Sequence, residues 1–335
     1  MIASYGLMLF LCNEKNEIRF FTHGPVLWQG MIRPNFFIVG APKCGTTALA
    51  SYLRDHPAVF LTDPKEPHFF ATDMDVHRYV RTEEAYLALF KHAKQHHHAI
   101  GEASVGYLFS AVALANIRRF NPDARIIAMV RNPVDMVQSL HRQLVYAGYE
   151  DEPDFEKAWR LQDARKRGES IPMLCRAPGF LQYGDACSLG RQIEHLYAVF
   201  PREQVHVIVF DDLVRNAAKV YRDTLTFLGL PSDDRVIFEV VNEAKTIRFS
   251  WLGNLTSRLK PVAMRFALGL RRLTGLNIFG FLKRVIQLNQ VKAKKPPIPA
   301  HMVIELQAHF ESDVALLATL LDRDLRGWTS ATVGS

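Results

Sequence analysis

Runs of apolar residues, separated by polar segments, divide the chain into alternating strands and helices. Three short runs are apolar almost throughout, which is typical of strands buried on both faces of a parallel sheet; they cover residues 36–39, 125–130 and 204–210. Longer segments repeat apolar residues at helical spacing: 48–53, 81–98, 113–120, 134–146, 151–169, 189–200, 214–228 and 300–321. This alternation predicts an α/β fold with a central parallel sheet and helices on both faces.

The loop after the first strand has the composition of an anion-binding loop. Gly40 and Gly45 bound it, and a helix follows at once. Backbone N–H groups at such a helix N-terminus favour a phosphate or a similar group. A Walker A loop carries Lys directly after its second glycine, whereas here Thr46 follows Gly45 and the cation stands earlier, at Lys43. The sequence therefore predicts a P-loop-like sheet whose loop holds an oxyanion with a different cation geometry.

A second candidate anion site follows the strand at 125–130. Arg131 comes directly after this strand, at the sheet edge where open α/β sheets bind ligands. Ser139 lies about two turns along the next helix. Arginine makes bidentate, charge-assisted contacts with phosphate, and serine adds a hydroxyl. The alternative is that Asn132 and Pro133 only begin the helix.

A third motif, Lys65-Glu66-Pro67-His68-Phe69-Phe70, suits neither a helix nor a strand. It places a carboxylate, a cation and an imidazole at a rigid corner. Glu66 within reach of a hydroxyl or amine could act as general base, and we expect burial beside Phe69 and Phe70 to raise its pKa. The alternative is a surface ion pair between Glu66 and Lys65.

Together these motifs resemble the sulfotransferases that use 3′-phosphoadenosine 5′-phosphosulfate (PAPS), in particular the bacterial and heparan-sulfate-type branches. P-x-x-G-T-T is similar to the family's 5′-phosphosulfate loop, and K-E-x-H-F-F is similar to the segment that carries its catalytic Glu. R-[DN]-P followed by five residues and then Ser is similar to its 3′-phosphate segment. The closing D-R-D-L-R-G-W resembles the tail of bacterial members. The resemblance covers about 35–250 and the closing helix.

The resemblance implies transfer of the sulfuryl group of PAPS to an acceptor hydroxyl or amine, without a metal. Glu66 is implied to take the acceptor's proton, with His68 second, and Lys43 to stabilise the leaving oxygen. The residues implied to bind the nucleotide are Lys43, Cys44, Gly45, Thr46, Thr47, Arg131 and Ser139, with Lys245 or Arg248 from a late basic loop.

Two other classes of function stay open at this point. A P-loop nucleotide kinase would need the lysine that is absent after Gly45. A nucleotide- or glycan-binding module without catalysis would bind the same ligands. Glu102 could orient Lys43, line the acceptor site or form a structural salt bridge, and Tyr183 could touch a ligand or only pack. The acceptor (glycan, lipid or small metabolite), O- versus N-sulfation and the oligomeric state are also left open.

Composition adds little to this picture. The chain has 335 residues, a formal net charge of +7 and a pI near 9.2, which favours anionic ligands. Four cysteines without a C-x-x-C pair indicate reduced thiols and a cytoplasmic setting. No basic–aromatic pattern of a nucleic-acid-binding protein is present. Three adjacent histidines, His96 to His98, cannot share one metal ion and suit a solvated helix end.

Two segments stand apart from the main domain, which we expect to span 31–330. Residues 1–30 form an extension to which we assign no role in the fold. Residues 252–295 carry many Lys and Arg among apolar residues and no acidic residue. This basic helical segment could cover the acceptor pocket, touch a membrane surface peripherally or remain an exposed helical pair.

Overall fold

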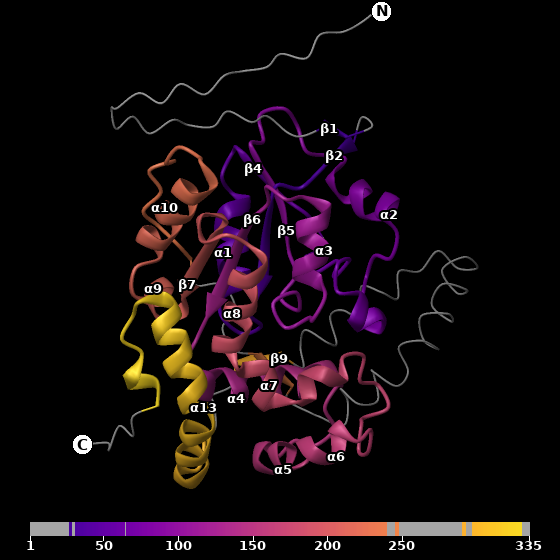
Figure 1. The fold of residues 1–335 in the computed structure, drawn as a ribbon, viewed down its shortest axis with the longest axis vertical. Coiled ribbons are helices and arrows are strands. Elements are labelled where there is room, and N and C mark those ends of the chain that lie inside the picture. The colour runs from indigo at the N-terminus through magenta and orange to yellow at the C-terminus, as the bar shows by residue number, and fades with distance from the viewer. Residues whose placement is uncertain are drawn as a thin grey trace, which may run out of the picture.

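The computed structural model of the chain describes residues 27–28, 31–63, 65–239, 245–247, 290–292 and 297–329. Its centre is a sheet of five parallel strands in the order β4-β5-β3-β6-β7 (Figure 1). The strands are β3 (Phe36–Gly40), β4 (Val59–Leu61), β5 (Ala99–Ala103), β6 (Arg125–Val130) and β7 (Val205–Val209). The predicted parallel sheet is confirmed.

The middle of the sheet is dry, as the apolar runs predict. Every residue of β3 is buried, and β5 is buried throughout although it contains a glutamate, Glu102. Phe36 pairs with Gly101 on one side and with Arg125 on the other. A Cβ at Gly101 would lie 2.4 Å from the Phe36 carbonyl oxygen, so only glycine permits this close approach of the two strands.

Helices cover both faces of the sheet because the chain leaves β3 in two directions. The first crossover goes outward to β4 and the later ones return past β3 to β6 and β7, and right-handed crossovers in opposite directions put their helices on opposite faces. One layer contains α1 (Thr46–Arg54) and α10 (Ala217–Leu228), which contact each other; the other contains α3 (Ala113–Phe120), α8 (Leu189–Val199) and α13 (Ala300–Leu321).

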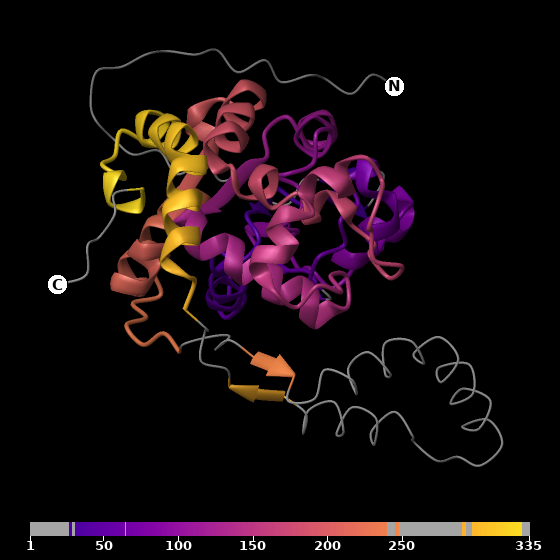
Figure 2. The same cartoon turned by 90° about the horizontal axis from the view of Figure 1, so that it is seen from below.

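The remaining described elements are short, apart from one long helix. They are α2 (Glu83–Leu87), α4 (Pro133–Ala147), α5 (Phe155–Arg160), α6 (Gln162–Lys166), α7 (Tyr183–Cys187) and α9 (Phe210–Arg215), with 3₁₀ turns at Thr72–His77, Ala88–Phe90, Pro178–Leu181, Arg202–Gln204 and Arg326–Trp328. Leu27–Trp28 (β1) pairs with Met31–Ile32 (β2), so pairing reaches into the predicted extension. A ribbon of β8 (Lys245–Ile247) and β9 (Gln290–Lys292) lies outside the central sheet (Figure 2).

The closing helix and its tail attach to two other parts of the chain. Asp313 on α13 accepts hydrogen bonds from the backbone N–H groups of Gly190 (2.7 Å) and Arg191 (3.0 Å), so it caps the N-terminus of α8. Arg323 forms a bidentate ion pair with Asp212 on α9. Trp328 donates its indole N–H to Asp211 at 3.2 Å. The acidic pair after the last strand therefore anchors the tail.

Three predicted helices differ from the structure. The helix expected over 81–98 ends at Phe90, because the chain must turn back to β5: the Lys94 N–H bonds the His97 ring and the His98 N–H bonds the Ala58 carbonyl. The segment 151–169 divides into α5 and α6 at Leu161. The segment 214–228 divides where Asn216 caps α10.

Much of the predicted extension and nearly all of the basic segment 252–295 lie outside the described residues, as does Arg248. Among the helices that the structure does describe, none is both long and apolar enough to cross a bilayer.

Candidate active site

The loop between β3 and α1 has the backbone of a phosphate-binding turn. Lys43 and Gly45 both have positive φ angles, 65° and 92°. A Cβ at Gly45 would also lie 2.9 Å from the Phe210 ring, so glycine is required there for two reasons. The Gly45 carbonyl accepts the N–H groups of Ala48 and Leu49, which begins α1. The N–H groups of this turn thus lie at the start of a helix, where an anion is favoured.

Cys44 lies in this loop with its side chain fully buried. Its thiol contacts the Pro42 carbonyl and the Met136 sulfur. Burial raises the pKa of the Cys44 thiol to about 12, with Arg131 and Lys43 acting in the opposite direction. The thiol is therefore neutral at pH 7, and the part of Cys44 that can face a ligand is its backbone.

The structure brings Lys43 and Arg131 together. The Arg131 guanidinium donates to the Lys43 carbonyl at 3.2 Å, and the Lys43 ammonium donates to Gln143 Oε1 on α4 at 3.1 Å. Both residues follow neighbouring strands, β3 and β6, at the point where the strand order reverses. Burial, with repulsion from Arg131 and Arg142, lowers the pKa of Lys43. Two positively charged segments therefore meet at one sheet edge.

Arg131 is held in place from two sides. Its guanidinium lies 4.6 Å from the centre of the Phe210 ring, and Asp135 lies 3.8 Å from it. The Asn132 side chain accepts the Val134 N–H at 3.0 Å and so caps α4. Asn132 therefore caps the helix while Arg131, whose side chain is largely buried, stands at the sheet edge.

Ser139 lies on the face of α4 that turns toward the loop. It precedes Gln143 by four residues, so the two side chains share one helix face. Since Gln143 bonds Lys43, this face is directed at the loop. Ser139 is half-buried.

The Lys65–Phe70 corner places its carboxylate at the end of β5. The Glu66 N–H bonds the Ala103 carbonyl at 3.0 Å. Its carboxylate lies 3.0 Å from His68 Nε2 and 3.1 Å from Lys65 Nζ. The Lys65 ammonium also contacts the hydroxyls of Thr47 (3.1 Å) and Thr46 (3.4 Å). Lys65 thereby joins the corner to the loop. The sequence predicts Lys65 only as an ion-pair partner of Glu66, although its position next to Glu66 also indicates a place in the site.

The pKa of Glu66 moves in the opposite direction from our expectation. Burial acts to raise it, but the hydrogen bond from His68 and the charge of Lys65 outweigh burial and lower the pKa to about 2. The side chain is 32% exposed and lies between two donors, whereas the expectation assumed an apolar pocket. The expected rise was wrong, and Glu66 is ionised at neutral pH.

Glu102 and Tyr183 lie inside the protein. The Glu102 carboxylate is buried and accepts hydrogen bonds from Tyr86, Tyr107 and Ser104, which matches none of the three roles expected for it. Tyr183 is also buried and donates to Glu150 at 2.5 Å. Glu150 in turn forms a buried bidentate ion pair with Arg165. This pair was not predicted, because 15 residues separate the partners in the sequence. Of the two roles expected for Tyr183, the structure shows packing in the interior.

The two late basic residues are only partly placed. Lys245 begins β8, whose backbone lies against α4. Arg248 falls outside the described residues. In the described ranges, no three His, Cys, Asp or Glu side chains are grouped as metal ligands would be.

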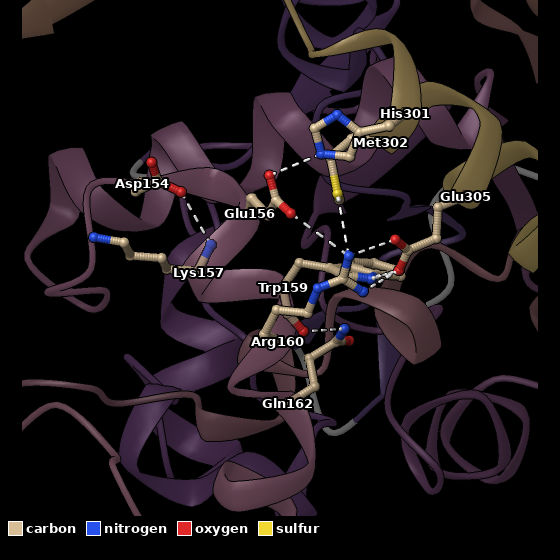
Figure 3. Close-up of polar contacts among 9 residues, drawn as sticks. All are labelled: Asp154, Glu156, Lys157, Trp159, Arg160, Gln162, His301, Met302 and Glu305. Atoms are coloured by element: carbon tan, nitrogen blue, oxygen red, sulfur yellow. Dashed lines mark hydrogen bonds and ion pairs between the residues drawn. The ribbon is translucent and has the colours of Figure 1, made fainter.

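A surface hollow of about 550 Å³ lies elsewhere, along α5. Figure 3 shows the polar contacts beside it: Arg160 pairs with Glu305 on α13, Trp159 donates to Glu305 at 2.9 Å, and His301 lies 3.0 Å from Glu156. These contacts join α5 to α13. None of the predicted site residues lines the hollow.

An α/β sheet with a P-loop-like turn, a second cation after the neighbouring strand and a carboxylate between two donors defines a nucleotide-dependent transferase site. The family model described as "Sulfotransferase domain" matches residues 33–252. The chain belongs to the sulfotransferase family.

Individual relatives agree with this assignment. Human carbohydrate sulfotransferase 15 is 31% identical in an alignment 147 residues long, which covers 32% of this chain and 26% of the human protein. Mouse heparan sulfate glucosamine 3-O-sulfotransferase 3A1 is 28% identical in an alignment 209 residues long, which covers 59% of this chain and 46% of the mouse protein. The match thus spans less than half of each curated relative. A solved sulfotransferase from Alicyclobacillus acidocaldarius has a TM-score of 0.65 at 28% identity and covers 89% of this chain and 99% of its own.

Proposed function

We propose that this protein transfers the sulfuryl group of PAPS to a hydroxyl or amine and releases adenosine 3′,5′-bisphosphate. The observation that carries the proposal is the meeting of three motifs from distant parts of the chain. Arg131 bonds the backbone of Lys43, and Lys65 bonds both Thr47 and the catalytic candidate Glu66. These cations would bind one ligand with anionic groups at both ends.

The donor would be held at two places. The backbone N–H groups of residues 43–47 and the N-terminus of α1 would bind the 5′-phosphosulfate, with the Thr46 and Thr47 hydroxyls beside them. Arg131 and Ser139 would bind the 3′-phosphate. Lys245 or Arg248 would close over the nucleotide, an assignment supported by the position of β8 against α4.

Transfer would proceed by one displacement at sulfur. The acceptor oxygen or nitrogen forms a bond to sulfur while the bond from sulfur to the bridging phosphate oxygen breaks. Glu66 takes the acceptor's proton, and His68, 3.0 Å away, orients the carboxylate or serves as the alternative base. Lys43 and Lys65 stabilise the charge on the departing oxygen, so we assign no metal a role.

Donor binding would also make Glu66 a stronger base. In the described structure Lys65 is shared between Glu66 and the loop hydroxyls. A phosphosulfate beside Thr47 gives Lys65 a second anionic partner. When Lys65 moves toward that partner, one of the two groups that lower the pKa of Glu66 is withdrawn, and the basicity of the carboxylate rises.

The names of the relatives make a sugar hydroxyl the first acceptor class to test. Lipid and small-metabolite acceptors follow, and the basic segment 252–295 is proposed as a lid over the acceptor or a peripheral membrane contact. We place the protein in the cytoplasm. Free thiols at Cys44, Cys175 and Cys187 support this placement. We propose no nucleic-acid partner.

The test is a transfer assay with radiolabelled PAPS against a panel of glycan, lipid and small-molecule acceptors. Lys43→Ala should abolish transfer, while Lys91→Ala, an exposed lysine on a turn away from the site, should leave the rate unchanged. Hydrolysis or transfer of phosphate from ATP with Mg²⁺, without use of PAPS, would favour the kinase instead. Tight binding of the bisphosphate without transfer to any acceptor would favour a binding module.

A further inference from the structure

A buried carboxyl lies directly beneath the Lys65–Phe70 corner. Glu102 on β5 is 0% exposed. One carboxylate oxygen accepts the hydroxyls of Tyr107 (2.7 Å) and Tyr86 (3.0 Å), and the other accepts the hydroxyl of Ser104 (2.7 Å). An ionisable group without contact to solvent, surrounded by three hydroxyls, is costly to keep in a fold. The proposed transfer step does not use it directly.

Two of the three hydroxyls continue to the backbone of the corner. Ser104 Oγ accepts the N–H of His68 at 3.1 Å, and the Tyr107 hydroxyl accepts the N–H of Phe70 at 3.4 Å. Among the described contacts, the Tyr86 hydroxyl bonds Glu102 and no backbone amide. Glu102 is therefore linked to the corner through Ser104 and Tyr107.

The direction of these hydrogen bonds depends on the charge of Glu102. A hydroxyl has one proton to donate, and an ionised carboxylate can only accept. Ser104 and Tyr107 therefore donate their hydroxyl protons to Glu102, and their oxygens accept from the backbone N–H groups. A side-chain amide or a protonated carboxyl at position 102 would donate to one of the hydroxyls. That hydroxyl would have to turn its own proton away from Glu102, and its oxygen would be shared between the new donor and the backbone N–H.

The corner needs such external support. Glu66 and His68 both have left-handed backbone conformations, with φ angles of 70° and 51°. Such conformations are strained for residues other than glycine and persist where the surroundings determine them. The bond from the His68 N–H to Ser104 lies between these two residues and the sheet.

We propose that Glu102 is a positioning residue, which acts through Ser104 to hold the Glu66–His68 pair in the geometry for proton transfer. This inference rests on the proposed function, because it assigns Glu66 and His68 their roles in that reaction. Glu102 touches neither the donor nor the acceptor in it.

The protonation of Glu102 gives the proposal a pH signature. The groups that face it are Tyr86, Tyr107 and, at longer range, His68. Burial raises the pKa of Glu102 to about 7, although its three hydroxyl donors act to lower it. The turnover rate of the wild type should therefore fall as the pH drops through about 7. Glu102→Gln separates this titration from that of Glu66, whose pKa is proposed to rise from about 2 when the donor binds.

The decisive comparison is between two variants that each remove one hydroxyl from Glu102. Ser104→Ala breaks the link to the His68 N–H, whereas Tyr86→Phe breaks no backbone contact that the structure describes. We expect Ser104→Ala to lower kcat about tenfold or more, since small misplacements of catalytic groups have effects of this size. The KM for PAPS should stay within about twofold. Tyr86→Phe should keep kcat within about threefold.

Two further measurements complete the test. Glu102→Gln should lower kcat and abolish the fall near pH 7. Amide hydrogen exchange of the His68 N–H, followed by NMR, should accelerate in Ser104→Ala and Glu102→Gln but not in Tyr86→Phe. This second readout needs no acceptor. Wild-type protein that transfers nothing from PAPS, yet shows this exchange pattern, would refute the proposed function and keep the link from Glu102 to His68.

The inference itself fails on either of two results. Ser104→Ala and Glu102→Gln with wild-type kcat, pH profile and exchange would show that the corner holds its geometry without Glu102. Equal losses of kcat and of thermal stability in all three variants, with Tyr86→Phe included, would show a cluster that only stabilises the fold.

Discussion

Single residues of the site differ in what fixes them. Lys43 and Arg131 are held by contacts with each other's segment, whereas Glu66 is held by two donors, His68 and Lys65. The first arrangement concentrates positive charge for an anion. The second arrangement keeps the Glu66 carboxylate ionised. Its strength as a base therefore depends on whether Lys65 leaves it when the donor binds.

Replacing the carboxylate isolates its role in proton transfer. Glu66→Gln should lower the transfer rate about 10²- to 10⁴-fold, the usual contribution of a general base. It should change the affinity for adenosine 3′,5′-bisphosphate by less than about threefold. Initial rates and calorimetry measure the two effects. Glu84→Gln, an exposed glutamate on α2, is the matched control, and a rate loss of the same size there would remove the assignment.

The stability of the protein should depend on pH through Glu102. Its pKa is about 7 in the fold against an ordinary value of 4.5, so between these values the folded state binds more protons than the unfolded state. Stability should therefore fall as the pH rises from about 4.5 to 7, by up to about 3 kcal/mol. Urea unfolding at pH 5 and pH 8 checks this, and Glu102→Gln should flatten the difference. Glu66 adds no slope there, because the stability from its lowered pKa is lost only below 4.5, toward pH 2.

At the scale of elements, contacts between helices far apart in the chain keep the layers together. α13 contributes the cap of α8 through Asp313 and the pairing with α5 through Glu305. Within the middle of the chain, the buried pair of Glu150 and Arg165 receives the Tyr183 hydroxyl of α7. Such polar contacts determine how neighbouring helices are oriented, in addition to the apolar core.

The cap that α13 supplies to α8 can be measured. Asp313→Ala leaves the N–H groups of Gly190 and Arg191 without their acceptor. Loss of an N-terminal cap costs about 1–2 kcal/mol, which denaturant unfolding should detect. Glu311→Ala, an exposed residue on the same helix, should change stability by less than about 0.5 kcal/mol. Equal effects from the two substitutions would contradict the capping role.

The buried ion pair should be costly to break from one side. Arg165→Met leaves the Glu150 carboxylate buried with Tyr183 as its remaining side-chain donor. Removing one partner of such a pair typically destabilises a fold by about 3–5 kcal/mol. Thermal unfolding should show this loss, and the double variant Glu150→Gln/Arg165→Met should recover part of it. A single variant as stable as the wild type would mean that the pair is solvated.

For the whole molecule, the sequence predicted more of the sheet than of the polar interior. The continuous apolar runs placed β3, β6 and β7, because strands buried on both faces leave a local signal. The family and the fold class were also predicted and are confirmed. The hydroxyls around Glu102, the pair of Glu150 with Arg165 and the shift of Glu66 were not predicted, since each depends on neighbours that folding brings together. The roles assigned to the site residues stay predictions.

Binding of the nucleotide should raise the thermal stability of the whole molecule. A ligand at about 100 times its Kd stabilises the folded state by about 2.7 kcal/mol. Adenosine 3′,5′-bisphosphate should therefore raise Tm by several degrees in the wild type and by much less in Arg131→Ala. The Arg326→Ala variant, whose guanidinium pairs locally with Asp324, should show the wild-type shift. A wild-type Tm shift in Arg131→Ala would show that Arg131 does not bind the nucleotide.

The attachment of Arg323 to Asp212 has a consequence for biosynthesis. Asp212 lies in the first turn of α9, two residues after Phe210, and the Phe210 ring supports the Arg131 guanidinium. The helix that carries this aromatic support is thus fastened by residues translated more than a hundred positions later. A nascent chain arrested on the ribosome before residue 300 should already bury its central strands. It should nevertheless bind adenosine 3′,5′-bisphosphate weakly. Binding of the nucleotide would then appear only after α13 and the segment that carries Arg323 have been synthesised.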